Sequence, residues 1–119
     1  MKIKKALVTG GTSGIGLAIC EELLQLGVEV YSVSRNPKKI EPQTKFHQLP
    51  LDLSDLNSVS QFGDEFIDQY GTPDLLINNA GYGAFYEWKE FPREEIEKQI
   101  SVLLTAPVLL CKSFAPKME

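Results

Sequence analysis

The sequence predicts an α/β fold, in which a doubly wound parallel sheet ends after about four strands. Two observations predict it: short apolar segments alternate with segments of helical periodicity, and a glycine-rich turn joins the first such pair. Strands that alternate with helices favour a parallel sheet covered on both faces. Because the 119 residues contain no internal repeat and no low-complexity segment, we expect residues 1–119 to form a single domain.

The first three elements follow from the spacing of apolar residues. Ile3–Val8 is short, apolar and followed by glycines, which is typical of a strand, whereas Ile15–Leu26 repeats apolar residues at helical spacing and stops at Gly27. Val28–Val33 is rich in β-branched residues and is bounded by Gly27 and by a turn sequence, which indicates a second strand.

The middle of the chain repeats this order. After a polar loop, Phe46–Leu51 is predicted as a third strand, and Ser54 or Asp55 can cap a helix that runs to about Tyr70. Glycine and proline stop that helix, and Asp74–Ile77 is short and apolar enough for a fourth strand.

The last predicted element is a long helix that begins at Pro92. Proline suits the first turn of a helix, and the acidic residues near its start suit the positive end of the helix dipole. Pro107 lies inside the same helix, where it removes a backbone donor and crowds the preceding turn. We therefore expect a bend or an interruption near Pro107.

Composition and charge exclude several classes of function. A formal net charge of -4 and a pI of about 5.0 leave no broad basic surface, so we expect no nucleic-acid partner. The longest apolar stretch, Val102–Cys111, has about half the length needed to span a bilayer, and the lysines near the N-terminus precede no long apolar run. We therefore expect no membrane partner, no export signal and a cytoplasmic location.

No metal or redox site is predicted. Cys20 and Cys111 show no CxxC spacing and have no neighbouring histidine, so we interpret both as small buried apolar residues. His47 has no evident partner in the sequence, and we interpret it as an ordinary strand or loop histidine.

The turn Thr9–Gly16, with the sequence TGGTSGIG, carries the first chemical signal. Glycines in such a turn let backbone N–H groups approach a pyrophosphate, whose charge the start of the following helix favours. We assign this role to Gly10, Gly14 and Gly16. A P-loop is excluded because no GK[ST] follows. The alternative is a glycine-rich turn that binds no ligand, and other features must decide between the two interpretations.

A second motif, NNAG at residues 78–81, directly follows the fourth predicted strand, at the sheet edge where parallel sheets bind ligands. With both motifs the chain resembles the short-chain dehydrogenase/reductase family, whose patterns TGxxxGxG and NNAG they match. The resemblance implies a Rossmann-like fold that binds an NAD(P) dinucleotide. The glycine spacing does not suit the sugar-nucleotide epimerases, and NNAG argues against an adenosyl-cofactor methyltransferase.

The resemblance also implies cofactor contacts for individual residues. These residues lie in both motifs, after the third strand and in the last helix: Thr12, Ser13, Ile15, Asp52, Asn79, Ala80, Gly81 and Val102. The hydroxyls of Thr12 and Ser13 would touch the ribose or a phosphate, and residues 79–81 would approach the ribose. Val102 would pack near the adenine, whose amino group would donate a hydrogen bond to Asp52. A helix-capping or surface aspartate is the alternative for Asp52.

The end of the second strand predicts which dinucleotide binds. NAD binders place a carboxylate about 20 residues beyond the glycines to hold the ribose 2′-hydroxyl, but this sequence reads Ser34-Arg35-Asn36 there. A guanidinium suits a 2′-phosphate, which it binds with two parallel donors. We therefore assign Ser34 and Arg35 to the site and expect NADP(H) in preference to NAD(H). A solvated Arg35 without a ligand is the alternative.

The family's catalytic residues have no match in this chain. The resemblance implies a tyrosine that exchanges a proton with the substrate and a lysine four residues later, yet none of Tyr31, Tyr70, Tyr82 and Tyr86 has a lysine at that spacing. Leu103 stands where the family commonly has a catalytic asparagine. The resemblance covers only about the first half of a typical family domain. We therefore assign no catalytic residue and expect this chain to be inactive.

Two functions stay open. One is an oxidoreductase of the family that uses NADP(H) on a carbonyl or alcohol substrate, and the other is a non-catalytic nucleotide-binding or self-associating fragment. We expect a homo-oligomer, because the fourth strand and the last helix lack the fifth strand that covers them in the family. The residues predicted to form the contact are Leu103, Leu104, Val108, Leu109 and Leu110.

Overall fold

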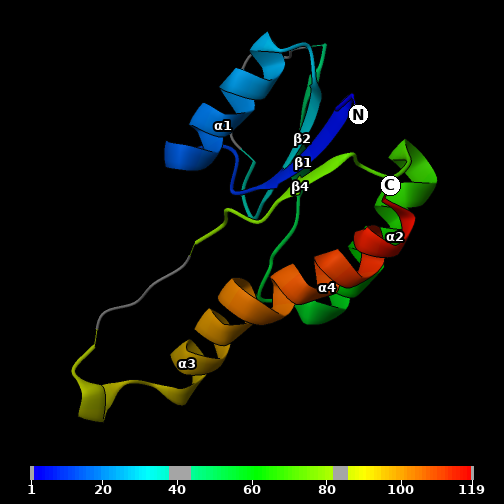
Figure 1. The fold of residues 1–119 in the computed structure, drawn as a ribbon. Helices are drawn as coiled ribbons and strands as arrows, with labels where there is room; N and C mark the ends of the chain where they lie inside the picture. The colour runs from blue at the N-terminus through cyan, green and yellow to red at the C-terminus, as the bar shows by residue number, and fades with distance from the viewer. Residues whose placement is uncertain (1, 38–43, 82–85, 119) are drawn as a thin grey trace.

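The computed structural model describes residues 2–37, 44–81 and 86–118, in which four strands form one parallel sheet (Figure 1). The strands are β1 (Lys5–Thr9), β2 (Glu29–Ser34), β3 (Phe46–Pro50) and β4 (Leu75–Ile77). Their spatial order is β3-β2-β1-β4, so β1 pairs with β2 on one side and with β4 on the other. The predicted α/β class and its four-stranded parallel sheet are confirmed.

Helices cover both faces of the sheet. Helix α1 (Gly14–Gln25) lies against one face, whereas α2 (Leu56–Tyr70) and α4 (Ala106–Phe114) lie together against the other (Figure 1). The start of α2 is capped by Asp55, whose carboxylate accepts a hydrogen bond from the backbone N–H of Ser58 at 3.2 Å. The second of the two predicted caps is therefore the one that the helix uses.

Successive residues of the central strands are buried on opposite faces of the sheet. Ala6, Val8 and Val30 belong to a cluster that includes residues of α1, whereas Leu7 and Val33 belong to a cluster that includes residues of α2 and α4. This alternation follows from the two-residue period of a strand. Both faces are apolar, as a parallel sheet covered on both sides requires.

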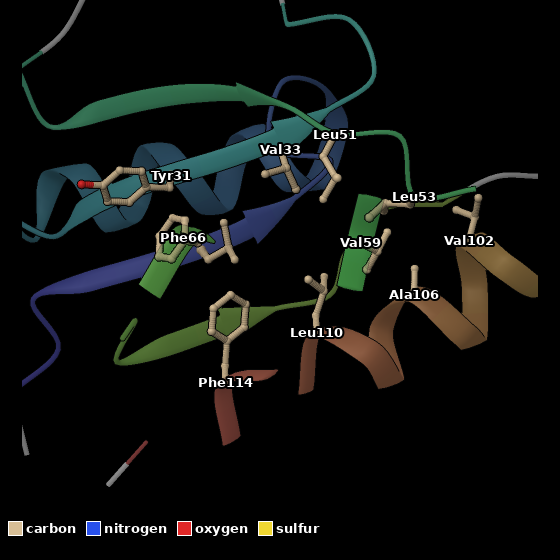
Figure 2. Close-up of a cluster of buried hydrophobic side chains, with 11 residues drawn as sticks. Tyr31, Val33, Leu51, Leu53, Val59, Phe66, Val102, Ala106, Leu110 and Phe114 are labelled. Carbon is tan, nitrogen blue, oxygen red and sulfur yellow. The ribbon is translucent and has the colours of Figure 1, made fainter. Parts of the chain in front are cut away.

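The contact between α2 and α4 fixes the second layer of the fold. Leu110 and Phe114 of α4 point toward Phe66 of α2 (Figure 2), and the two phenylalanine rings meet edge to face with centroids 5.7 Å apart. Gly63 of α2 lies against Ser113 of α4, and a Cβ atom at Gly63 would overlap with the Ser113 side chain. The missing side chain therefore lets the two helices approach closely.

The last helical segment changes its hydrogen-bonding pattern without breaking. Helix α3 (Arg93–Ile100) continues into a π-helical turn (Ser101–Thr105) and then into α4. Across the π-helical turn, the backbone N–H of Ala106 donates to the carbonyl five residues earlier, and Pro107, which has no N–H, lies in the first turn of α4. The interruption predicted at Pro107 is thus a π-helical turn just before it.

The same helical segment is longer than the apolar stretch that was expected to be too short to span a bilayer. Arg93–Lys117 is a helix of 25 residues with a mean hydropathy of 1.3 over its most apolar 18 residues, which by length and composition alone could cross a membrane. The prediction considered only the stretch Val102–Cys111, whereas the helix extends beyond it at both ends. A core helix can pass the same test, and Ala106, Leu110 and Phe114 are fully buried within the cluster that α2 and the sheet share with α4.

We expect Gly63→Ala to lower the free energy of unfolding by about 1–3 kcal/mol, because the added methyl group must push α2 and α4 apart. Urea unfolding followed by circular dichroism measures this change. In a Ser113→Gly background the same substitution should cost less, since the overlapping side chain is gone. Ser60→Ala, at an exposed position of α2, is the matched control. An unchanged midpoint in Gly63→Ala would contradict the close packing.

Candidate functional site

The turn between β1 and α1 contains two glycines in the left-handed region. Gly10 has φ 68° and Gly14 has φ 55°, which residues with a Cβ atom rarely adopt. A Cβ atom at Gly14 would meet open space, whereas one at Gly16 would overlap with the Gly10 carbonyl and the Asn79 side chain. The structure therefore gives Gly16 a packing role, in which α1 begins directly against the turn.

Thr9 and Asn79 join this turn to the one that follows β4. The Thr9 hydroxyl oxygen accepts hydrogen bonds from the backbone N–H groups of Asn79 and Ala80, both at 2.9 Å, and donates to the Ile77 carbonyl at 3.5 Å. The Asn79 side-chain amide donates to the carbonyls of Thr9 and Gly10, both at 3.2 Å. Because Thr9 is only 1% exposed, these bonds replace contacts with water. We call them the Thr9–Asn79 clamp.

A cavity of about 540 Å³ opens at the carboxyl ends of the strands, beside this clamp. Most of the predicted cofactor residues line it: Gly10, Thr12, Ser13, Ile15, Ser34, Arg35, Asp52, Asn79, Ala80, Gly81 and Val102. Gly14 and Gly16 were predicted too but are not part of the lining. The lining residues that the sequence did not predict are Val33, Asn36, Leu51, Leu53 and Lys98.

The start of α1 faces the cavity with uncapped backbone. Ser13, the N-cap residue, has an extended conformation with φ -157° and ψ 160°, and its side chain makes no capping hydrogen bond. No acidic residue lies in the first turn of α1. The first N–H groups of an α-helix have no partner within the helix, and the helix dipole makes this end partly positive. The arrangement suits an anion such as a phosphate.

Charged side chains line the cavity beyond the ends of β2 and β3. The Asp52 carboxylate accepts hydrogen bonds from the hydroxyl of Ser54 at 2.7 Å and from its backbone N–H at 2.9 Å. These bonds hold the pKa of Asp52 below its ordinary value. Burial acts in the opposite direction but more weakly than the bonds, and the positive charges of Arg35 and Lys98 lower the pKa by smaller amounts than burial raises it. Asp52 is therefore an ionised acceptor near two cations.

Lys98 is the charged lining residue that sequence reasoning missed. It lies on α3, one helical turn before Val102, and is half-buried. Residues four apart lie on the same side of a helix. Helical spacing from Val102, which the family resemblance had already assigned to the site, could therefore have found it.

The residues that were expected to lie outside any site differ in their surroundings. Cys20 is buried, and burial raises the pKa of its thiol to about 11, but Cys111 is exposed, so the prediction of two buried cysteines is wrong for Cys111. His47 stacks on Tyr31 with ring centroids 4.6 Å apart, and its Nε2 lies 3.0 Å from a Glu29 carboxylate oxygen. Within the described ranges, no three potential metal ligands come together.

Comparison with known proteins gives matches along nearly the whole chain. A family model described as short chain dehydrogenase matches residues 4–119. The uncharacterized oxidoreductase YxjF of Bacillus subtilis is 32% identical, over 100% of this chain and 49% of its own. The crystal structure of a metagenomic short-chain oxidoreductase in complex with NADP is 32% identical, with a TM-score of 0.86 over 95% of this chain and 55% of that one.

A more distant match shows the shared fold. The short chain dehydrogenase from Leptospira borgpetersenii serovar Hardjo-bovis with bound NAD+ is 23% identical and has a TM-score of 0.85, over 96% of this chain and 45% of that one. This chain spans about a third to a half of the length of the curated relatives it matches, with shares of 33%, 49% and 41%.

We expect Thr9→Val to lower the free energy of unfolding by about 1–3 kcal/mol, because it leaves the N–H groups of Asn79 and Ala80 without their acceptor. Thermal unfolding measures the change, and Thr9→Ser, which keeps the hydroxyl, should retain most of the stability. If Thr9→Val unfolds at the same temperature as Thr9→Ser, the hydroxyl does not hold the two turns together.

Proposed function

This chain belongs to the short-chain dehydrogenase family, and we propose that its residues form the NADP(H)-binding half of an oxidoreductase that acts on a carbonyl or alcohol substrate. The observation that carries the proposal is the cavity at the carboxyl ends of the strands, which Gly10, Asn79, Asp52 and Arg35 line together. Ligands of open parallel sheets bind at this edge.

The walls of the cavity suit the parts of a dinucleotide. A pyrophosphate suits the uncapped start of α1, where a Cβ atom at Gly14 would meet open space. Leu51, Leu53 and Val102 are buried apolar residues that line the cavity and can pack against the adenine, and the Asp52 carboxylate would accept a hydrogen bond from the adenine amino group. When bound, the nicotinamide supplies or receives the hydride of the reaction.

The preference for NADP(H) rests on Arg35. Arg35 is exposed at the end of β2, lines the cavity, and forms no ion pair with another described residue. A carboxylate at this place would bind the ribose 2′-hydroxyl of NAD(H), whereas a guanidinium binds a 2′-phosphate through two charge-assisted hydrogen bonds.

We further propose that these 119 residues bind the cofactor without catalysing the reaction. No tyrosine in the chain is followed four residues later by a lysine. Leu103, at the position of the family's asparagine, has no hydrogen-bonding side chain, is 50% exposed and is not part of the cavity lining. No residue of this chain is therefore assigned to proton transfer.

We expect calorimetric titration to show that the chain binds NADPH more tightly than NADH. Arg35→Ala should weaken NADPH binding by roughly tenfold or more, because it removes charge-assisted hydrogen bonds to the 2′-phosphate, and should leave NADH binding nearly unchanged. Arg93→Ala is the matched control, since Arg93 is an exposed arginine that pairs with Glu97 and is not part of the cavity lining. If neither dinucleotide binds, the proposed function is wrong.

We also propose that the exposed side of the last helical segment is a contact between two copies of this chain. Ile96, Ile100, Leu104 and Val108 recur at four-residue intervals and are 39%, 51%, 61% and 57% exposed. Separately, β4 is an edge strand that pairs only with β1 among the described strands. Exposed apolar surface and an unpaired strand edge each favour association.

Two of the residues predicted to form this contact are fully or partly buried inside the chain in the structure. Leu110 is fully buried against α2 and the sheet, and Leu109 is partly buried there, so neither can lie at the centre of a contact between two copies. Leu103, Leu104 and Val108 remain exposed.

We expect sedimentation velocity to show a dimer or larger species whose population rises with protein concentration. Leu104→Glu should shift the chain toward the monomer, because it places a charge in the apolar stripe. Leu26→Glu is the matched control, since Leu26 is 77% exposed at the end of α1, on the opposite side of the sheet. A wild-type chain that stays monomeric at high concentration would rule out this contact.

A further inference from the structure

Two cations from different elements line the same cavity. Arg35 follows β2, whereas Lys98 comes from α3, more than sixty residues later in the sequence. Both are close enough to Asp52 for their charges to lower the pKa of its carboxyl group. The three charged groups therefore share the part of the cavity beyond β2 and β3.

The charges of these groups bear on the choice of ligand. Arg35 and Asp52 together sum to no net charge, and Lys98 makes this part of the cavity positive. A phosphate monoester carries about -1.5 to -2 charges at pH 7, whereas the 2′-hydroxyl that it replaces carries none. A dianion near Asp52 is therefore better balanced by two cations than by Arg35 alone.

The two cations differ in ways that let them act together. A guanidinium is a planar fork that needs a fixed direction of approach, whereas an ammonium is a compact charge on a flexible four-carbon stem that can reach a phosphate oxygen from the side. Lys98 is half-buried on a helix and is one of the residues that line the cavity. A lysine stem can lie along apolar surface while its charged end stays in contact with water or a ligand.

Resting on the proposed NADP(H) function, we propose that Lys98 is a second specificity-determining residue, whose ammonium binds the ribose 2′-phosphate together with the Arg35 guanidinium. The preference for NADP(H) then depends on two positions that are far apart in the sequence. The planar guanidinium of Arg35 would orient the 2′-phosphate, and the ammonium of Lys98 would offset the negative charge of Asp52.

The test is a calorimetric titration of NADPH and NADH into the full chain and its Lys98 variants, repeated with adenosine 2′,5′-bisphosphate and 5′-AMP. Lys98→Ala should weaken the binding of NADPH and of the bisphosphate about tenfold, with about twofold or less effect on NADH and 5′-AMP. Lys98→Arg, which keeps the charge, should retain the preference. Lys98→Gln keeps the stem and should behave as Lys98→Ala does, and circular dichroism checks that each variant is folded.

Lys112→Ala is the matched control, because it removes the same charge from an exposed helical position that does not line the cavity. A wild-type chain that prefers NADPH, combined with a Lys98→Ala variant that keeps this preference or weakens both dinucleotides equally, overturns the inference and leaves the proposed function standing. A wild-type chain that binds neither dinucleotide overturns both.

Discussion

The Thr9–Asn79 clamp is the constraint on which the candidate site depends. The glycine turn after β1 and the NNAG turn after β4 are separated by about seventy residues, and strand pairing alone does not fix how the two loops meet beyond the sheet edge. The Thr9 hydroxyl satisfies two backbone donors of the second turn, and the Asn79 amide satisfies two carbonyls of the first. Both turns are thereby held as the walls of one cavity, and α1 begins against them because Gly16 has no side chain.

Much of the fold could be predicted from local patterns, because each strand is apolar and short and each helix has a distinct start or stop. The last helical segment could not be predicted as fully. Residues 102–104 and 108–110 are apolar on every side, so helical periodicity cannot separate the buried Leu110 from the exposed Leu104 and Val108. The π-helical turn before Pro107 shifts the side chains that follow it, and packing against α2 then decides which of them is buried.

In the site too, some residues could be predicted from local sequence motifs, whereas others are brought there only by tertiary packing. Motif residues such as Gly10, Asn79 and Asp52 can be recognised from a few neighbouring residues in the sequence, and they line one cavity in the structure. Lys98 belongs to no motif and reaches the cavity only because α3 extends from the helical segment that carries Val102. The motif did point to Thr9 and Asn79, but the hydrogen bonds between them depend on the order of the strands, which places β4 beside β1.

The proposal is that this chain, which spans about half of the length of its relatives or less, binds a dinucleotide without the catalytic tyrosine and lysine. The most direct measurement is a two-dimensional ¹H–¹⁵N spectrum of the labelled chain, recorded as NADPH is added. We expect shifts at amides around the cavity, including those of Ser13, Asn36 and Gly81, with no oxidation of NADPH by carbonyl compounds. An unchanged spectrum, or shifts confined to residues outside the cavity, would contradict it.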